Sequence, residues 1–117
     1  MNEWSITRSL AMNRKRSGAI IGVRGCRLGA MIRIQPDVEI ILGRSPQSDI
    51  QFDDAKISRK HCGIVYSVIS DSYSVYDYSK NGVFLEDGKR LPEGWNTGLL
   101  PGTALCLGTE GNMIRLG

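Results

Sequence analysis

The sequence contains no long apolar run, and this absence excludes the simplest way of crossing a membrane. None of its apolar stretches approaches the roughly 20 residues that a membrane-spanning helix requires. The N-terminus also lacks the apolar segment of a secretory signal peptide. We therefore expect a chain that does not span a membrane and that is cytoplasmic.

Cysteine and histidine are scarce, which argues against the common metal-binding and disulfide-stabilised frameworks. The chain has three cysteines, Cys26, Cys62 and Cys106, and one histidine, His61. The cysteines are odd in number, far apart and without Cys-x-x-Cys spacing, so neither a disulfide framework nor a zinc site is predicted. We expect Cys62 and Cys106 to be small core residues, and we predict no metal ion and no cofactor.

Acidic residues are almost missing from the first 33 positions, although they are common afterwards. This segment has seven basic residues and one acidic residue, whereas the remainder has eight basic and eleven acidic residues, which gives net charges of +6 and −3. Residues 1–28 also show no sustained periodicity and include several glycines. We interpret residues 1–28 as a basic, partly ordered N-terminal arm, in which a short helix at residues 4–12 is one option.

Helical periodicity is also missing from residues 31–117, where short apolar or alternating runs are separated by turn residues. Three hairpins are predicted: residues 31–34 with 38–42, residues 61–68 with 73–78, and residues 83–85 with 90–91. The pattern predicts one all-β domain, a sandwich of roughly nine or ten short strands in two sheets. The loops of such a domain carry any function.

Three polar clusters follow predicted strands and therefore fall on loops. They are Gly43-Arg44, Ser58-Arg59-Lys60-His61 and Asp77-Tyr78-Ser79-Lys80-Asn81-Gly82. Together they provide cations, a hydroxyl and an amide, but few strong acceptors. Such a set suits a doubly charged oxyanion such as a phosphate monoester, which needs several fixed donors around it.

The chemistry of these side chains indicates how they could share a phosphate. Arg44 offers a planar fork of N–H donors, and Ser58 offers a hydroxyl. Arg59 or Lys80 can add a positive charge or a backbone N–H, and Asn81 adds an amide that can hold a peptide backbone.

The order of these motifs resembles that of a forkhead-associated (FHA) domain. Gly-Arg is followed after about fourteen residues by Ser-Arg-x-His, and after about twenty more by Asn-Gly. The similarity covers about residues 29–117 and includes Ser48-Asp49-Ile50 and the Asp-x-Ser-x-Asn-Gly pattern that starts at Asp77. It implies a sandwich of two twisted, mostly antiparallel sheets with about eleven short strands, which binds phosphothreonine peptides through the loops at one end.

Carried over to this sequence, the resemblance implies roles in phosphopeptide binding for five residues. Arg44 and Ser58 would contact the phosphate. Arg59 and Lys80 would flank it, and Asn81 would hold the main chain of the peptide.

The resemblance also implies residues that support the site or select the peptide. His61 would be structural and would brace the loop beside it, while Gly43 and Gly82 would shape the turns. Lys56 lies where family members often select the peptide residue three places after the phosphothreonine, and a lysine there would favour an acidic or polar side chain. Val83 stands where the family frequently has threonine.

We therefore expect a module that recognises phosphothreonine in partner proteins, which would themselves be substrates of a Ser/Thr kinase, for signalling or assembly. A phosphate-independent interaction or scaffold module of the same fold is the alternative. Solvated charges and ordinary turns are the plainer interpretation of the same motifs. An enzyme is not predicted, because a hydrolase would need Ser58 or Cys62 activated by His61, and the sequence has no nucleophile elbow or NTPase phosphate loop.

The basic arm suggests further partners. Such a segment can bind nucleic acid or an anionic membrane surface, but most are only solvated or lead to another domain, so we do not predict nucleic-acid binding. Thr7 lies beside Arg8, and a phosphorylated Thr7 could occupy the site of a second copy and drive self-association.

Overall fold

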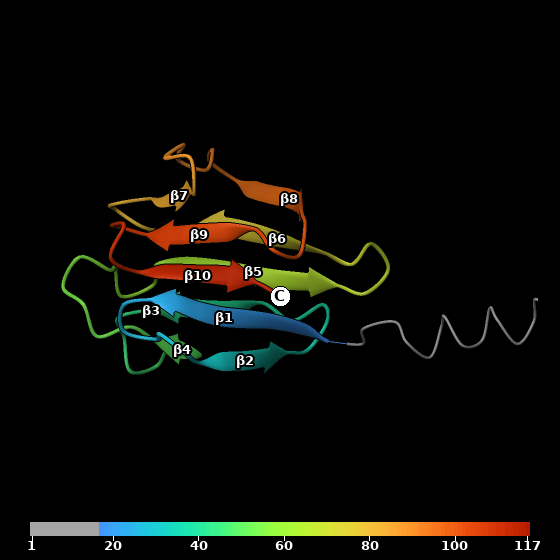
Figure 1. The fold of residues 1–117 in the computed structure, drawn as a ribbon, viewed down its shortest axis with the longest axis horizontal. Helices are drawn as coiled ribbons and strands as arrows, with labels where there is room; N and C mark the ends of the chain where they lie inside the picture. Colours follow the sequence, from blue (N-terminus) through green and yellow to red (C-terminus); the bar gives the residue numbers. More distant parts are fainter. Residues whose placement is uncertain (1–16) are drawn as a thin grey trace, which may run out of the picture.

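Two five-stranded β-sheets pack face to face in this protein. The computed structural model describes residues 17–117, which contain ten strands and no helix (Figure 1). The strands are β1 (Gly18–Arg24), β2 (Met31–Ile34), β3 (Ile40–Gly43), β4 (Ile50–Gln51), β5 (Cys62–Ser67), β6 (Ser72–Asp77), β7 (Val83–Leu85), β8 (Trp95–Leu99), β9 (Ala104–Leu107) and β10 (Met113–Leu116). The predicted all-β sandwich is confirmed. This part of the chain has no helix that could cross a membrane.

The described chain changes sheet four times, between β2 and β3, β6 and β7, β7 and β8, and β8 and β9. The first sheet has the order β2-β1-β10-β9-β7, and the second has the order β4-β3-β5-β6-β8. In Figure 1 the strands of the first sheet lie in front of those of the second. All pairs of neighbouring strands are antiparallel except β3 and β4, which run parallel.

The hydrophobic core lies between the two sheets and is filled from alternating strand positions. In β5, for example, Cys62, Ile64 and Tyr66 are completely buried. The ring of Tyr66 lies 4.9 Å from that of Tyr73, centroid to centroid. Burying side chains of this size stabilises the fold by about 1.5–3 kcal/mol each. Cys106 is buried in a second, smaller apolar cluster with Ala104 and Met113, so the prediction that Cys62 and Cys106 are small core residues is confirmed.

Strand β1 corrects the expected extent of the N-terminal arm. We expected residues 1–28 to belong to the arm, but Gly18–Arg24 form a strand that pairs with β2 on one side and β10 on the other. Its buried and partly buried residues alternate, yet Ile20 and Ile21 are both apolar, so the sequence shows no alternation. The arm up to residue 16 and the helix expected at residues 4–12 lie outside the described residues.

The hairpin predicted from residues 31–34 and 38–42 is wrong. β2 pairs with β1 in the first sheet, whereas β3 pairs with β4 and β5 in the second. The chain crosses between the sheets at Pro36, which forms an isolated bridge with Tyr66, and at Asp37, whose φ is 63°. The backbone N–H of Asp37 donates to the carbonyl of Tyr66 at 2.9 Å. A Pro-Asp pair indicates a turn. Here the turn leads the chain from the first sheet to the second instead of closing a hairpin.

The other two predicted hairpins are present. β5 and β6 pair over six residues. β7 makes a tight hairpin in which the N–H of Leu85 donates to the carbonyl of Lys89 and the N–H of Leu91 donates to that of Val83, both at 2.8 Å. The Asp87-Gly88 turn has the positive φ at Gly88, 89°, that such a turn requires. The more extensive partner of β7 is β9.

Candidate functional site

Three loops meet at one end of the second sheet. The pairings Leu42 with Cys62 and Cys62 with Asp77 place the end of β3, the start of β5 and the end of β6 in one row. The loops that continue from these strands cover residues 44–49, 52–61 and 78–82. They therefore emerge side by side, on the left of Figure 1.

Arg44 is held at the start of the first of these loops. Its backbone N–H donates to the carbonyl of Ser58 at 2.9 Å, and its Nε donates to the carbonyl of Ile57 at 3.0 Å. The side chain is exposed. Because the guanidinium is fixed through Nε, its two terminal nitrogens can be directed at a ligand.

Gly43 allows the first two loops to approach each other. A Cβ added at Gly43 would lie 1.9 Å from the carbonyl oxygen of Arg59. Any other residue at this position would push residues 58 and 59 away from the end of β3. The N–H of Ser45, which donates to the same carbonyl at 3.2 Å, would be displaced with them.

His61 connects the second loop to the third from a completely buried position. Its Nδ1 accepts the backbone N–H of Ser58 at 3.0 Å, so the proton of the neutral ring lies on Nε2, which donates to the carbonyl of Gly82 at 2.8 Å. Burial is the main cause that lowers the pKa of His61 below its usual value, and the bond to Gly82 opposes this. The ring is therefore neutral at pH 7.

The hydroxyl of Ser58 faces the third loop. Its Oγ accepts the backbone N–H of Lys80 at 3.1 Å, which leaves the hydroxyl proton available to a ligand. The bond that joins Ser58 to His61 comes from the backbone N–H and not from Oγ. This is not the arrangement of an activated serine, in which the base must take the hydroxyl proton.

Asp77 and Ser79 shape the third loop, and sequence reasoning assigned neither of them a role. Oδ1 of Asp77 accepts the N–H and the hydroxyl of Ser79 at 2.8 and 2.5 Å. Oγ of Ser79 accepts the N–H of Gly82 at 2.7 Å, and Oδ2 of Asp77 accepts that of Val83 at 3.2 Å. Gly82 has a φ of 100°. The Asp-x-Ser-x-Asn-Gly pattern was a usable signal, because short polar side chains commonly cap turns in this way.

Asn81 and Lys56 join the loops at their exposed tips. Nδ2 of Asn81 donates to the carbonyl of Lys56 at 2.8 Å. The carboxamide oxygen of Asn81 can still accept an N–H from a ligand. The side chain of Asn81 thus lies beside the loop that carries Ser58.

Asn112, to which the sequence analysis assigns no role, supports the second loop through side-chain hydrogen bonds. It is 2% exposed, its Nδ2 donates to Oδ2 of Asp54 at 2.8 Å, and its Oδ1 accepts the N–H of Cys26 at 3.2 Å. Oδ1 of Asp54 in turn accepts the N–H of Lys56 at 2.8 Å. The hydrogen bond from the Lys56 backbone is the main cause that lowers the pKa of Asp54, and the bond from Asn112 adds to it. Nothing local in the sequence indicates a contact between positions so far apart.

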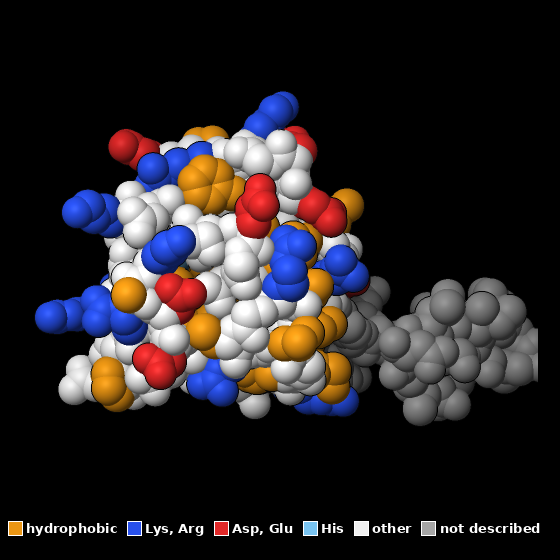
Figure 2. Space-filling view, turned by 60° about the vertical axis from the view of Figure 1, so that its left-hand side comes forward, with side chains coloured by type: hydrophobic (Ala, Val, Ile, Leu, Met, Phe, Trp, Pro, Cys, Tyr) orange, Lys and Arg blue, Asp and Glu red, His pale blue; other side chains and the backbone are white. Residues whose placement is uncertain are grey.

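Exposed cations surround the three loops. They are Arg44, Lys56, Arg59, Lys60 and Lys80. Figure 2, which brings this end of the molecule forward, shows several Lys and Arg side chains projecting from its left-hand edge. Lys60 packs over the ring of Tyr78 with Nζ 4.0 Å from the centroid. A hollow of about 370 Å³ lies between Arg44 and Arg59.

The arrangement can bind an anion and lacks a nucleophile-base pair. Cys62, the other candidate nucleophile, is fully buried, and its burial raises the pKa of its thiol. Within residues 17–117 no group of three or more His, Cys, Asp and Glu side chains could hold a metal ion. The available chemistry at this end is a set of fixed N–H and O–H donors with positive charges around them.

A comparison with family sequence models identifies the family, and the match includes the three loops. The FHA-domain model matches residues 40–108, which is more than half of the chain. The chain belongs to the FHA-domain family. The matched segment begins at β3 and ends after β9, so all three loops of this FHA domain lie inside it. FHA domains are interaction modules.

Solved structures agree with this assignment. The FHA domain of the CT664 protein from Chlamydia trachomatis is 27% identical, with a TM-score of 0.74 over 86% of this chain and 95% of that one. The FHA domain of a hypothetical Arabidopsis thaliana protein is 28% identical, with a TM-score of 0.74 over 88% and 86%. Mycobacterium tuberculosis EmbR, solved with a low-affinity phosphopeptide, is 21% identical, with a TM-score of 0.69 over 96% of this chain and 28% of that one. The comparison with curated proteins gives no significant match.

Proposed function

We propose that this FHA domain binds a phosphothreonine-containing segment of a partner protein at the three loops. The observation that carries the proposal is the contiguity of Arg44 and Ser58. Their backbones are hydrogen-bonded at 2.9 Å, and the exposed guanidinium and the hydroxyl project from the same end. A phosphate dianion placed there would accept charge-assisted bonds from both side chains.

The remaining loop residues extend this site along a bound peptide. Arg59 and Lys80 flank the phosphate, and the carboxamide of Asn81 holds the peptide backbone. Lys56 favours an acidic or polar peptide residue on its side of the loops. The loops are held together by His61, which bonds to Ser58 and Gly82, and by the close approach of the backbone at Gly43. Gly82 shapes the turn of the third loop.

The comparisons support this proposal at the level of the family. EmbR was solved with a phosphopeptide, and another similar solved structure, 21% identical, comes from work on phosphothreonine-dependent FHA domain interactions. The partner of this chain would then be the substrate of a Ser/Thr kinase, and binding would follow its phosphorylation. Self-association through a phosphorylated Thr7 stays a prediction, because Thr7 lies outside the described residues.

Calorimetric titration with three versions of one peptide tests the proposal. The peptide, taken from an oriented phosphopeptide library, carries phosphothreonine, phosphoserine or unmodified threonine. We expect micromolar affinity for the phosphothreonine form, on the order of −7 to −9 kcal/mol, and much weaker binding of the others. Arg44→Ala should weaken binding by about 1.5–3 kcal/mol, because it removes hydrogen bonds to a charged group.

Arg33→Ala provides a matched control. Arg33 is an exposed arginine on β2 of the first sheet, away from the three loops. It should leave affinity unchanged. Equal affinity for phosphorylated and unmodified peptides would instead indicate a phosphate-independent interaction module, and an unaltered affinity in Arg44→Ala would remove that residue from the site.

A further inference from the structure

A second apolar cluster lies outside the main core, on the outer face of the first sheet. Ala104 and Cys106 of β9 and Met113 of β10 are 4–6% exposed, and Val23 and Phe84 pack against them. Strand alternation turns these residues away from the second sheet, because their neighbours Leu105 and Ile114 belong to the core between the sheets. Among the described residues no further strand packs on this outer face, and its small apolar cluster is covered only by neighbouring side chains such as Val23 and Phe84.

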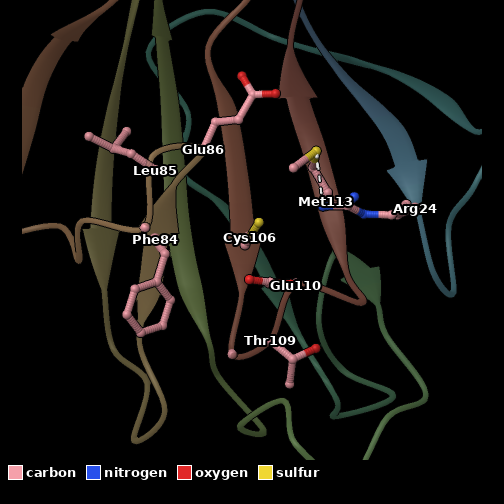
Figure 3. A pocket seen from close by; sticks show the side chains of 10 residues that line it. Arg24, Phe84, Leu85, Glu86, Cys106, Thr109, Glu110 and Met113 are labelled. Atoms are coloured by element: carbon pink, nitrogen blue, oxygen red, sulfur yellow. Dashed lines mark hydrogen bonds between the residues drawn. The ribbon is translucent and has the colours of Figure 1, made fainter.

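This face is hollowed into a groove of about 480 Å³. Phe84, Cys106 and Met113 supply its apolar surface, and Glu86 and Glu110 stand at its rim (Figure 3). At the β1 side the groove is closed by Arg24, whose Nη2 lies 3.7 Å from Sδ of Met113. Its volume is in the range of pockets that hold sizeable ligands. None of the proposed phosphate-contacting residues lines it.

The segment that precedes β1 has a composition that complements this groove. Residues 1–16 contain the apolar residues Trp4, Ile6, Leu10 and Met12, together with four basic residues and one acidic residue. The segment therefore has a net charge of +3. The groove offers an apolar floor between two carboxylates and one guanidinium, so both the apolar and the charged parts of the segment have matching surfaces there.

Residues 4–17 are also long enough to bring Trp4 from the start of β1 to the groove. β1 leads from Gly18 to Arg24, a path of about 20 Å at 3.3 Å per residue, and Arg24 stands at the groove. Thirteen positions separate Trp4 from Ser17. They span about 43 Å if extended and about 20 Å if helical. An extended segment therefore lets Trp4 reach the groove of its own molecule, whereas a fully helical one is too short to run back along β1 and across the sheet.

We propose that residues 1–16 dock into the groove between β7, β9 and β10 of the same molecule, with apolar side chains led by Trp4 on Phe84, Cys106 and Met113. The basic residues of the segment lie near Glu86 and Glu110. The proposal does not depend on phosphopeptide binding, since the groove and the three loops are different surfaces.

Fluorescence of Trp4 tests the proposal in the full chain. Trp4 and Trp95 are the two tryptophans, and Trp95 is partly exposed on β8 of the second sheet, so Trp95→Phe leaves Trp4 as the only reporter. We expect blue-shifted emission and several-fold slower acrylamide quenching than in a free peptide of residues 1–16. Trp4 quenched as readily as in the free peptide would overturn the proposal.

Charge reversal at the rim supplies the matched comparison. In the double variant Glu86→Lys with Glu110→Lys, the quenching rate of Trp4 should rise towards that of the free peptide. Both glutamates are exposed, and lysines in their place would repel the basic segment. Asp53→Lys with Glu93→Lys makes the same change of charge at exposed positions outside the groove and should have no effect. Equal effects of the two pairs would overturn the groove as the docking site.

Two further measurements identify the occupant. Quenching should be independent of protein concentration, whereas protection that appears only at high concentration would mean docking onto a second copy and would overturn docking within one molecule. A saturating phosphopeptide should leave Trp4 protected, whereas loss of this protection would place the segment on the three loops.

Amide hydrogen exchange gives an independent readout. Exchange around residues 84–86 and 108–110 should be faster in Trp4→Ala than in the unsubstituted chain.

Discussion

The ring of His61 accepts the backbone N–H of Ser58 through Nδ1, at 3.0 Å. This bond can form only while Nδ1 carries no proton. The position of the serine that we propose as a phosphate contact therefore depends on a neutral, buried imidazole. Protonation of that ring would remove the acceptor and place an uncompensated charge in a completely buried site.

Stability should therefore fall in mildly acidic solution. The folded-state pKa of His61 is lowered, chiefly by burial, so the unfolded chain binds the proton more readily. This contribution to stability is complete above the unfolded pKa of about 6.5 and is lost as the pH falls through the folded pKa. Thermal unfolding between pH 7.5 and 5.5 should show a declining Tm. His61→Asn should show a shallower decline, and parallel curves for the two proteins would contradict this role of His61.

Ser58→Ala should weaken phosphothreonine-peptide binding by about 1.5–3 kcal/mol, or roughly ten- to 150-fold. The substitution removes a donor to the phosphate and also the acceptor of the Lys80 N–H. Isothermal titration gives the affinity. Ser74→Ala, on β6, is the control and should bind as the natural chain does. A loss confined to folding stability, with affinity intact, would show that Ser58 only supports the loops.

Gly43→Ala should destabilise the fold by about 1–3 kcal/mol, the usual cost of forcing extra volume into a packed site, and should weaken peptide binding. The added Cβ would lie 1.9 Å from the backbone oxygen of Arg59. Urea denaturation measures the change. Gly111→Ala is the matched control, because the nearest atom to its added Cβ is the Thr109 hydroxyl at 3.2 Å. Equal effects of the two substitutions would contradict the close approach at Gly43.

The three thiols should react in a fixed order. Cys26 is exposed, whereas Cys62 and Cys106 are buried, and burial raises the pKa of Cys62 so that little reactive thiolate forms. Under native conditions a thiol reagent such as dithionitrobenzoate should modify one thiol quickly. Cys26→Ser should abolish this fast phase, and the other two should react only in denaturant. Fast modification of two thiols in the native chain would contradict the burial described here.

The sequence predicts the parts of this fold whose signals are local. Residues 61–68 and 73–78 form their hairpin because each run reads as a strand and a short polar turn joins them. The loop clusters around Arg44, Ser58 and Asn81 are also visible, because strand ends and turn residues mark them. Their convergence follows from the pairing of β3, β5 and β6, which the sequence alone does not contain.

The errors arise where distant contacts decide the structure. β1 was assigned to the arm because apolar residues occupy both of its faces. Pro36 was assigned to a turn because nothing local shows that the chain continues into the second sheet. The role of Asn112 has no local signal, because its partners, Cys26 and Asp54, lie 86 and 58 positions away. Each depends on which segments become neighbours in three dimensions.

The place of β1 inside the first sheet determines how far the chain can be shortened. A fragment beginning at residue 29 would retain all three recognition loops but would lose the strand between β2 and β10. Both of those strands would then expose unpaired backbone N–H and C=O groups, which readily pair with other molecules and lead to aggregation. A shortened protein intended for peptide-binding measurements should therefore start no later than Ser17.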